Sequence, residues 1–234
     1  MKLKDAGVLV TGGSSGIGYA IAETLAKAGA RVAITGRNSS RLTKAAHAIG
    51  AEAMQADVSK EADVLRTFEQ FKAKIGRLDV LVNNAGLGVF KKLVDFSLDE
   101  MEYVLATNVK GAMLMAREAA KIFIAQNSGN IVNIGSTASH RGAPNGTAYY
   151  ASKFALRGMT ECWRGELRQY NIRVMLVNPS EVITNFGAAA GFEQKVNDSK
   201  LRGEEIAQAV RSVLEMDDRG FTTEVTVFAT NPKD

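Results

Sequence analysis

The amino-acid sequence predicts an α/β fold in which a seven-stranded parallel sheet carries helices on both faces, giving three layers. Short apolar runs rich in Val and Ile alternate with longer segments of helical period along the whole chain. This alternation is typical of parallel strands joined by crossover helices. Several runs are almost continuously hydrophobic, as expected of strands buried on both faces. The predicted strands are residues 8–11, 31–35, 53–56, 79–83, 130–135, 172–177 and 224–228.

Local signals define two helix boundaries and one long connection. A helix is predicted over residues 17–28, because Gly29 follows its apolar pattern as a C-terminal stop. Another is predicted to start at Ser97, because Ser97 and Glu100 have the spacing of a capping box. The weakly patterned residues at about 185–203 are predicted to form a loop with a short helix that covers a binding site; a surface insertion is the alternative.

The composition is that of one globular domain over residues 1–234. Hydrophobic residues make up 46% and charged residues 23% of the 234 residues, which excludes disordered and fibrous classes. The net charge of +4 is small and dispersed, so we expect a small anionic ligand rather than a nucleic acid or a membrane. A single cysteine and the lack of an apolar run of about 18 residues indicate a cytoplasmic protein.

A glycine turn follows the first predicted strand and opens the first predicted helix. Gly12, Gly16 and Gly18 let the backbone approach a phosphate closely, while free N–H groups and the positive end of the helix point at its charge. The spacing departs from G-x-G-x-x-G and is not that of a Walker loop. The turn predicts a Rossmann-type dinucleotide site, and a plain tight turn is the alternative. The other residues of the turn in this site are Ser14, Ser15 and Ile17.

The residues after the second and third strands indicate which dinucleotide is bound. A carboxylate after the second strand would bind a ribose 2′-hydroxyl, whereas a cation there accepts a 2′-phosphate. The sequence has Arg37 and no acid, which predicts NADP rather than NAD. Arg41 is an alternative phosphate ligand, and Arg37 is otherwise a solvated loop charge. Asp57 and Val58 are expected to flank the adenine, unless Asp57 caps a helix.

A tyrosine and a lysine four residues apart begin a predicted amphipathic helix. This spacing places Tyr149 and Lys153 on one face of the helix. A phenol acts as an acid near neutral pH only if its pKa falls, and the ammonium of Lys153 is expected to lower it. An ordinary surface pair is the alternative. Tyr150 is the rival tyrosine, but only Tyr149 lies one helical turn from Lys153.

Ser136 follows the fifth predicted strand, at the sheet edge where ligands of open α/β folds bind. Its hydroxyl is positioned to hold a carbonyl oxygen, although a turn-forming serine is the alternative. The sequence has no G-x-S-x-G motif, which argues against a hydrolase. His47, His140 and Cys162 do not form a metal-ligand set, so no metal is expected.

With these motifs in place, the chain resembles the short-chain dehydrogenase/reductase family over essentially its whole length. The glycine turn resembles the cofactor turn of the family, Tyr149 and Lys153 match its catalytic pair, and Ser136 stands where the family has its serine. Three further matches are Asn84, Ala85 and Gly86, which resemble the segment after the family's fourth strand. The resemblance implies that Tyr149 donates a proton to the substrate, that Ser136 positions the substrate oxygen, and that Lys153 holds the nicotinamide ribose.

Two other segments take their predicted roles from the resemblance alone. Asn108 matches the helix asparagine that holds a proton-relay water; a helix interruption is the alternative. Pro179, Val182 and Thr184 lie in a segment similar to the one that contacts the nicotinamide. This segment departs from the family pattern at Ser180, where glycine is usual, so the local backbone is expected to adjust.

The pattern is most similar to the 3-oxoacyl-(acyl-carrier-protein) reductases of fatty acid biosynthesis and related NADPH ketone reductases. It implies an NADPH-dependent reduction of a ketone, either free or carried as a thioester on acyl carrier protein or coenzyme A. The alternatives are the oxidation of a secondary alcohol, sugar or steroid, and a nucleotide-sensing protein without catalysis. The resemblance also implies a homodimer or homotetramer.

Overall fold

The computed structural model describes residues 1–184, 186–189 and 199–231. Within them, seven parallel strands form one sheet in the order β3-β2-β1-β4-β5-β6-β7. This confirms the predicted fold class, and the strand ends differ from the predicted ones by one or two residues. The strands are β1 (Gly7–Val10), β2 (Arg31–Gly36), β3 (Glu52–Gln55), β4 (Val80–Asn83), β5 (Gly129–Ile134), β6 (Ile172–Pro179) and β7 (Glu224–Val227).

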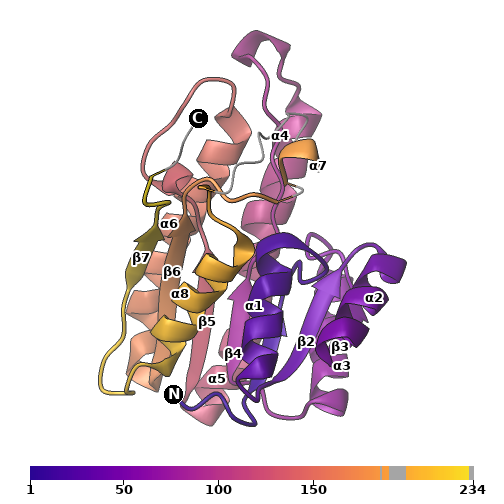
Figure 1. The fold of residues 1–234 in the computed structure, drawn as a ribbon, viewed down its shortest axis with the longest axis vertical. Helices are drawn as coiled ribbons and strands as arrows, with labels where there is room; N and C mark the ends of the chain where they lie inside the picture. The colour runs from indigo at the N-terminus through magenta and orange to yellow at the C-terminus, as the bar shows by residue number, and fades with distance from the viewer. Residues whose placement is uncertain (185, 190–198, 232–234) are drawn as a thin grey trace.

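Helices cover both faces of the sheet (Figure 1). Successive residues of β1 point to opposite faces, so Val8 and Val10 pack with α1, α2 and α8, whereas Leu9 packs with α3, α5 and the end of α6. The two apolar cores therefore lie on the two sides of one sheet, as the predicted three layers require. The helices are α1 (Gly16–Lys27), α2 (Ser39–Ile49), α3 (Glu61–Lys74), α4 (Leu98–Leu105), α5 (Ala112–Gln126), α6 (Thr147–Leu167), α7 (Phe186–Ala189) and α8 (Gly203–Glu215).

The predicted helix starts and stops are close to the observed ones. Ser97 is the N-cap of α4, and its hydroxyl and the Glu100 side chain form the expected capping box. The helix α1 ends at Lys27, two residues before Gly29, whose φ is +91°. Between α4 and α5 the helix widens into a π-helical segment, Ala106–Gly111, which contains Asn108. The alternative of a helix interruption at Asn108 thus takes the form of one wide turn in a continuous helix, while the role of Asn108 in a proton relay stays a prediction.

β1 and β4 are parallel neighbours in the sheet, and the order in which the chain adds strands changes direction between them. Chain connections from β1 lead to β2 and β3 on one side, while β4, β5, β6 and β7 extend the sheet on the other. Connections that diverge in this way leave a crevice at the carboxyl ends of the two central strands, where open α/β folds bind ligands. The carboxyl end of β1 is the glycine turn.

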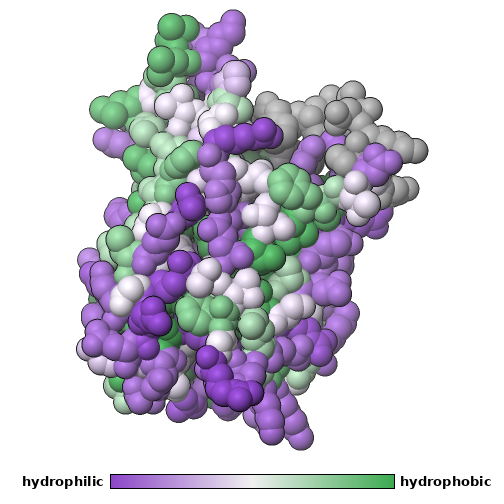
Figure 2. Space-filling view, turned by 90° about the vertical axis from the view of Figure 1, so that its left-hand side faces the viewer, coloured by the Kyte–Doolittle hydropathy of each residue, from purple (hydrophilic) through white to green (hydrophobic). Residues whose placement is uncertain are grey.

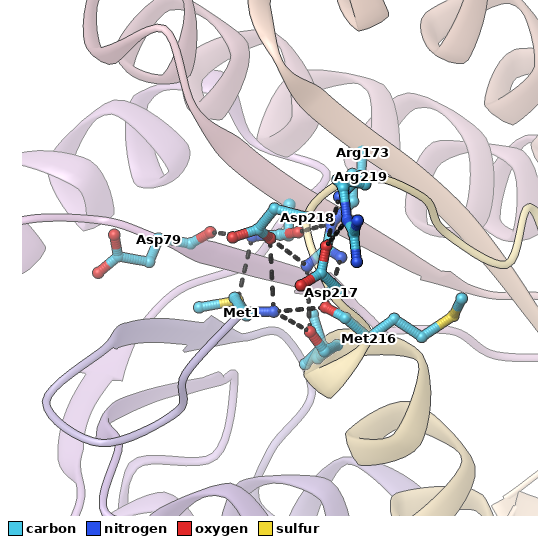
Figure 3. A network of polar contacts seen from close by, with 9 residues as sticks. Met1, Asp79, Arg173, Met216, Asp217, Asp218 and Arg219 are labelled. Atoms are coloured by element: carbon cyan, nitrogen blue, oxygen red, sulfur yellow. Dashed lines mark hydrogen bonds and ion pairs between the residues drawn. The ribbon is translucent and has the colours of Figure 1, made fainter.

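A polar network ties the amino end of β6 to the end of α8 (Figure 3). The buried Arg173 donates to Asn130 Oδ1 at 2.7 Å and to the carbonyl oxygen of Leu214 at 3.1 Å. The amino group of Met1 donates to the same Leu214 carbonyl at 2.8 Å and to that of Met216 at 2.7 Å. Cationic donors thus satisfy carbonyl groups at the C-terminus of α8, where the helix dipole is negative.

The segment predicted as a loop over the site lies partly outside the described residues, namely at 185 and 190–198. Its described parts are the short helix α7 and a bridge between Val182 and Leu201. Apolar side chains such as Leu93 and Val94 are exposed in the connection from β4 to α4. This connection forms one end of the molecule, where the space-filling view shows hydrophobic residues at the surface (Figure 2). Among the described helices, none has the length and apolar character needed to cross a membrane.

Candidate active site

The glycine turn has a backbone that requires its glycines. Gly12 and Gly16 have φ values of +66° and +56°, in the left-handed region that residues with a Cβ adopt with strain. Gly18 lies against the turn itself, because a Cβ atom there would be 2.3 Å from Asn84 Nδ2 and 2.4 Å from the Gly12 carbonyl oxygen. Gly12 and Gly16 are therefore required by their backbone conformation, and Gly18 is required by close packing against the turn.

The turn is held to the neighbouring strand by Asn84. Its backbone N–H donates to Thr11 Oγ1 at 3.0 Å, and its side-chain amide donates to the Thr11 carbonyl oxygen at 2.9 Å. The N–H of Ala85 shares the same hydroxyl at 3.0 Å. Gly86 follows directly, and a Cβ atom on it would lie 3.4 Å from Asn108 Oδ1. Asn84 and Ala85 thus fix the mouth of the crevice between β1 and β4.

The N-terminus of α1 opens onto this crevice. The N-cap residue Ser15 has an extended backbone, and its side chain makes no capping hydrogen bond. Gly16 is exposed, and a Cβ atom on it would lie 3.3 Å from Thr184 Cγ2. Ser14 faces Gly36 at the end of β2, and Ile17 packs against the core. The space beside Gly16 and the N–H groups at the start of the helix suit a phosphate of a dinucleotide.

Arg37 lies at the end of β2 with its side chain exposed. Its Nη1 donates to the hydroxyl of Tyr103 at 3.1 Å, and this hydrogen bond raises the pKa of the guanidinium above its ordinary value. Arg37 also lines an open pocket of about 600 Å³ beside β3, together with Ala56, Asp57 and Lys60. The alternative ligand Arg41 is exposed in the first turn of α2.

Asp57 and Val58 occupy the turn between β3 and α3. Asp57 Oδ1 accepts from the backbone N–H of Ser59 at 3.0 Å and from its hydroxyl at 2.7 Å. The N-cap position of α3 is Lys60, so Asp57 orders the turn before the helix rather than capping it. Val58 is buried, and its Cγ2 would be 2.7 Å from a Cβ atom on Gly111.

Tyr149, Lys153 and Ser136 come together at the carboxyl end of β5. Tyr149 forms a side-chain hydrogen bond with Ser136, whose Oγ also accepts from the Ala138 N–H at 3.1 Å. Lys153 Nζ lies 5.7 Å from the centroid of the Tyr149 ring and donates to the carbonyl oxygen of Ile134 at 2.9 Å. The helical spacing and the strand end therefore place the three side chains where the sequence predicted them.

The electrostatics of this group differ from the prediction. Burial raises the pKa of the Tyr149 phenol, and the Ser136 hydrogen bond only opposes that change. Burial also lowers the pKa of Lys153 to about 8. The prediction that the ammonium lowers the phenol pKa is thus wrong for this structure. The physical reason is that desolvation disfavours the charged form of both groups, and the ammonium is directed at Ile134.

Asn108 connects the π-helical segment to the loop after β4 and to α6. Its Oδ1 accepts from the Leu87 N–H at 2.9 Å, and its Nδ2 donates to the Leu87 carbonyl oxygen at 2.8 Å. Nδ2 also donates to Ser152 Oγ at 2.9 Å, and Ser152 Oγ donates to the Tyr149 carbonyl oxygen at 2.6 Å. Asn108 is therefore linked to the backbone of Tyr149 through one hydroxyl. Ser152 had no signal of its own in the sequence beyond its place between Tyr149 and Lys153.

Three aromatic rings surround Tyr149, and no motif in the sequence indicates two of them, Phe90 and Phe186. The ring centroids of Phe90 and Phe186 each lie 5.4 Å from that of Tyr149, and that of Tyr150 lies 6.0 Å away. Tyr150, the rival tyrosine, thus forms part of the wall. Phe90 and Phe186 stand in segments without helical or strand period, so no pattern in the sequence could have brought them together.

The segment after β6 is held by β7 and by the residues before α8. The N–H of Ser180, just after Pro179, donates to the Val227 carbonyl oxygen at 2.9 Å, and Ile183 N–H donates to that of Leu201 at 2.7 Å. Ser180 is not one of the described non-glycine residues with a positive φ, so serine is accommodated there without left-handed backbone. Val182 is buried, and Thr184 lies beside Gly16.

An open parallel sheet with a phosphate-type turn after β1, and a Ser-Tyr-Lys group at the carboxyl edge, define the class of protein as a nicotinamide-dependent oxidoreductase. Residues 6–195 match the family model of the short chain dehydrogenases. The chain belongs to the short-chain dehydrogenase family, which confirms the resemblance inferred from its motifs.

Individual relatives support this assignment. The chain is 39% identical over 178 residues to the 3-oxoacyl-[acyl-carrier-protein] reductase of Bos taurus, a match that covers 75% of each chain. Among solved structures, a 3-ketoacyl-(acyl-carrier-protein) reductase from Brucella melitensis complexed with NADH has a TM-score of 0.91 at 30% identity, covering 97% of this chain and 98% of that one. A metagenomic short-chain oxidoreductase in complex with NADP has a TM-score of 0.86 at 33% identity, covering 99% and 100%.

Proposed function

We propose that this protein reduces a ketone to a secondary alcohol with NADPH, and that the ketone is a 3-oxoacyl thioester or a similar carbonyl compound. The observation that carries the proposal is the meeting of Ser136, Tyr149 and Lys153 at the edge of the sheet that also holds the glycine turn. Two neighbouring hydroxyl groups can turn their O–H bonds away from each other and donate both hydrogens to one carbonyl oxygen.

The residues present fit a dinucleotide. A Cβ atom at Gly16 or Gly18 would fill the space or break the turn, and the start of α1 supplies backbone N–H groups without a side-chain cap. The phosphates would lie against Gly12, Ser14, Ser15, Gly16, Ile17 and Gly18, the adenine against Asp57 and Val58, and the nicotinamide side against Asn84, Ala85, Gly86, Pro179, Val182 and Thr184. When bound, the reduced nicotinamide supplies the hydride.

The choice of NADPH over NADH is part of the proposal and rests on Arg37. The guanidinium carries a planar set of donors, and it is exposed at the end of β2 with Tyr103 as its partner. Asp57, which follows the neighbouring strand β3, lines the same pocket as Arg37. A 2′-phosphate would replace the Tyr103 hydroxyl as the partner of Arg37.

The side chains of this chain would perform the rest of the reaction. Ser136 would position the carbonyl oxygen, and Tyr149 would donate its phenolic proton to that oxygen as negative charge develops. Lys153 would bind the ribose with its ammonium group, which its pKa of about 8 leaves charged on most molecules at pH 7. Asn108 would keep the π-helical segment and α6 in register through Ser152.

The relatives and the aromatic side chains around Tyr149 support the proposed substrate class. The curated relative from Bos taurus and the solved one from Brucella melitensis are both named as reductases of 3-oxoacyl groups on acyl carrier protein. Phe90, Tyr150 and Phe186 present apolar surface next to Tyr149, which suits the alkyl part of an acyl ketone better than a sugar.

The experiment is the loss of reduced-nicotinamide absorbance with purified protein and acetoacetyl-CoA, run in parallel with NADPH and NADH. The proposal expects turnover with NADPH and much slower turnover with NADH. Turnover of simple ketones but not of the thioester would replace the substrate class, and oxidation of secondary alcohols alone would reverse the direction. Binding of NADPH without turnover of any carbonyl or alcohol would favour the nucleotide-sensing alternative.

We also propose that the protein works in the cytoplasm as a homodimer or homotetramer. The long helices α5 and α6 carry exposed apolar side chains at Ile124 and Phe154, which a second copy would cover. Light scattering on the purified protein distinguishes the monomer from both assemblies. Replacement of Phe154 by Glu would lower the measured mass if α6 forms the interface.

A further inference from the structure

Glu224 stands at the start of β7 and contacts the catalytic edge through one buried residue. Its Oε1 accepts from Asn178 Nδ2 at 2.6 Å, and Asn178 Oδ1 accepts from the backbone N–H of Ser136 at 3.1 Å. Asn178 is fully buried at the end of β6. A carboxylate on the last strand is thus connected to the backbone of Ser136 by two hydrogen bonds in series.

The acceptor oxygen of Glu224 fixes which way the Asn178 amide points. With the amide turned over, its oxygen would face the carboxylate and its NH₂ group would face the N–H of Ser136, so both hydrogen bonds would become repulsive. A residue at position 224 without an acceptor oxygen removes half of that preference. Gly135 permits the close approach, because a Cβ atom there would lie 2.1 Å from Asn178 Oδ1.

Other groups hold Glu224 in this position. His140 Nε2 lies 2.8 Å from Oε1 and 3.3 Å from Asn178 Nδ2. In the tautomer that carries its hydrogen on Nε2, His140 donates to Oε1, and its contact with Asn178 Nδ2 is then not a hydrogen bond. From α6, Arg157 Nε lies 3.6 Å from Oε2. The carboxylate is therefore held by groups from β6, α6 and the segment after Ser136.

We propose that Glu224 is a positioning residue for the reaction, acting through Asn178 to hold Ser136 where its hydroxyl meets that of Tyr149. This inference rests on the proposed function, in which Ser136 positions the substrate oxygen. It predicts that the contribution of Glu224 to turnover passes through the Ser136 hydroxyl and leaves the binding of NADPH unchanged.

The catalytic test is a double-mutant cycle with Glu224→Ala and Ser136→Ala. In the wild-type background, Glu224→Ala is expected to lower kcat by about 10- to 100-fold, the range for small displacements of a positioning group, without changing the KM for NADPH. In the Ser136→Ala background, the same change is expected to alter kcat by less than about twofold. An equal loss in both backgrounds, or no loss in the first, overturns the proposal.

Two variants separate positioning from general damage to the fold. Glu224→Gln keeps an acceptor oxygen for Asn178 and is expected to recover most of the activity lost in Glu224→Ala. Glu161→Ala is the matched control, because Glu161 pairs with the same Arg157 at 3.5 Å without contacting Asn178. It is expected to match the wild type; a loss as large as that of Glu224→Ala would make Arg157, not Asn178, the relevant partner and overturn the proposal.

A second readout does not depend on turnover. Hydrogen exchange of a peptide covering residues 131–140, in which Ser136 lies well inside the peptide, reports the Ser136 N–H. Exchange is expected to be faster in Glu224→Ala and unchanged in Glu161→Ala, and equal protection in all three proteins overturns the inference. If the wild type reduces no carbonyl compound, the proposed function fails on its own, while the exchange result still decides whether Glu224 orders Ser136.

Discussion

The ammonium group of Lys153 donates a hydrogen bond of 2.9 Å to the backbone carbonyl oxygen of Ile134, the last residue of β5. The side chain is buried, and this burial lowers its pKa to about 8. A lysine held in this way connects α6 to the catalytic edge of the sheet. Burial of the charged ammonium also lowers the free energy of unfolding, and this loss can be measured.

Replacement of Lys153 by Met is expected to stabilise the protein at pH 7 while abolishing turnover. The pKa of Lys153 is lower in the folded than in the unfolded protein, so the unfolded chain binds more protons between about pH 8 and pH 10.5, and wild-type stability rises with pH across that window. The ionisation cost is about 3 kcal/mol, offset by about 1 kcal/mol for the lost hydrogen bond. Urea unfolding of both proteins should show the advantage of the variant shrinking from pH 7 to pH 10, and a constant gap would contradict the assignment.

Replacement of Tyr149 by Phe should abolish turnover and leave NADPH binding almost intact. The ring keeps its contacts with Phe90 and Phe186, and only the hydroxyl that bonds to Ser136 is lost. Fluorescence titration with NADPH and the kcat of the variant measure the two effects separately. Tyr150→Phe is the matched control, since its ring is neighbouring but its hydroxyl has no proposed role. Retained turnover in Tyr149→Phe would exclude Tyr149 as the acid.

Replacement of Arg37 by Ala should raise the KM for NADPH by about 10- to 100-fold, as expected when one charged hydrogen-bond partner of a phosphate is lost. The KM for NADH should stay as it is, because NADH has no 2′-phosphate. Steady-state kinetics with both cofactors, at one ionic strength, give the comparison. Arg41→Ala is the control at the alternative position. If Arg41→Ala and not Arg37→Ala produces the selective change, the phosphate ligand lies in α2.

Replacement of Gly18 by Ala is expected to abolish dinucleotide binding. The added Cβ atom would meet Asn84 Nδ2 at 2.3 Å and the Gly12 carbonyl oxygen at 2.4 Å, so the turn has to open. The control is Gly158→Ala in α6, where nothing lies within 4 Å of the added atom. That change should stabilise the helix by about 0.5–1 kcal/mol. Calorimetric titration with NADPH and thermal unfolding of the two variants test both statements, and normal binding by Gly18→Ala would refute the first.

The spacing of hydrophobic residues along the chain predicted the sheet and the helices and strands that carry the site. Short runs rich in Val and Ile identified strands such as β5, and the strand end placed Ser136 at the ligand edge. The four-residue spacing placed Lys153 under Tyr149. Both results are local consequences of chain geometry, since a strand ends where its pattern ends and a helix repeats every turn. Their catalytic roles stay predictions.

Contacts between distant segments could not be predicted in this way. Glu224 reaches Asn178 only because β7 pairs with β6, and Phe186 packs on Tyr149 from a segment without period. The raised pKa of Tyr149 has the same origin, because the desolvation that causes it comes from packing of several segments around one ring. Tyr103, the partner of Arg37, lies in α4, and no pattern in the sequence indicates that α4 lies near β2.

The π-helical segment Ala106–Gly111 makes α4 and α5 one continuous rod with one wide turn. The rod meets α6 through α4, and α3 and the sheet through α5. Deletion of one residue from the segment would rotate everything after it by about 100° about the rod axis. Either the apolar stripe of α5 or the amide of Asn108 would then face the wrong neighbour. In this stretch, the number of residues is therefore constrained along with their identity, and a single-residue gap should be less tolerated than most substitutions.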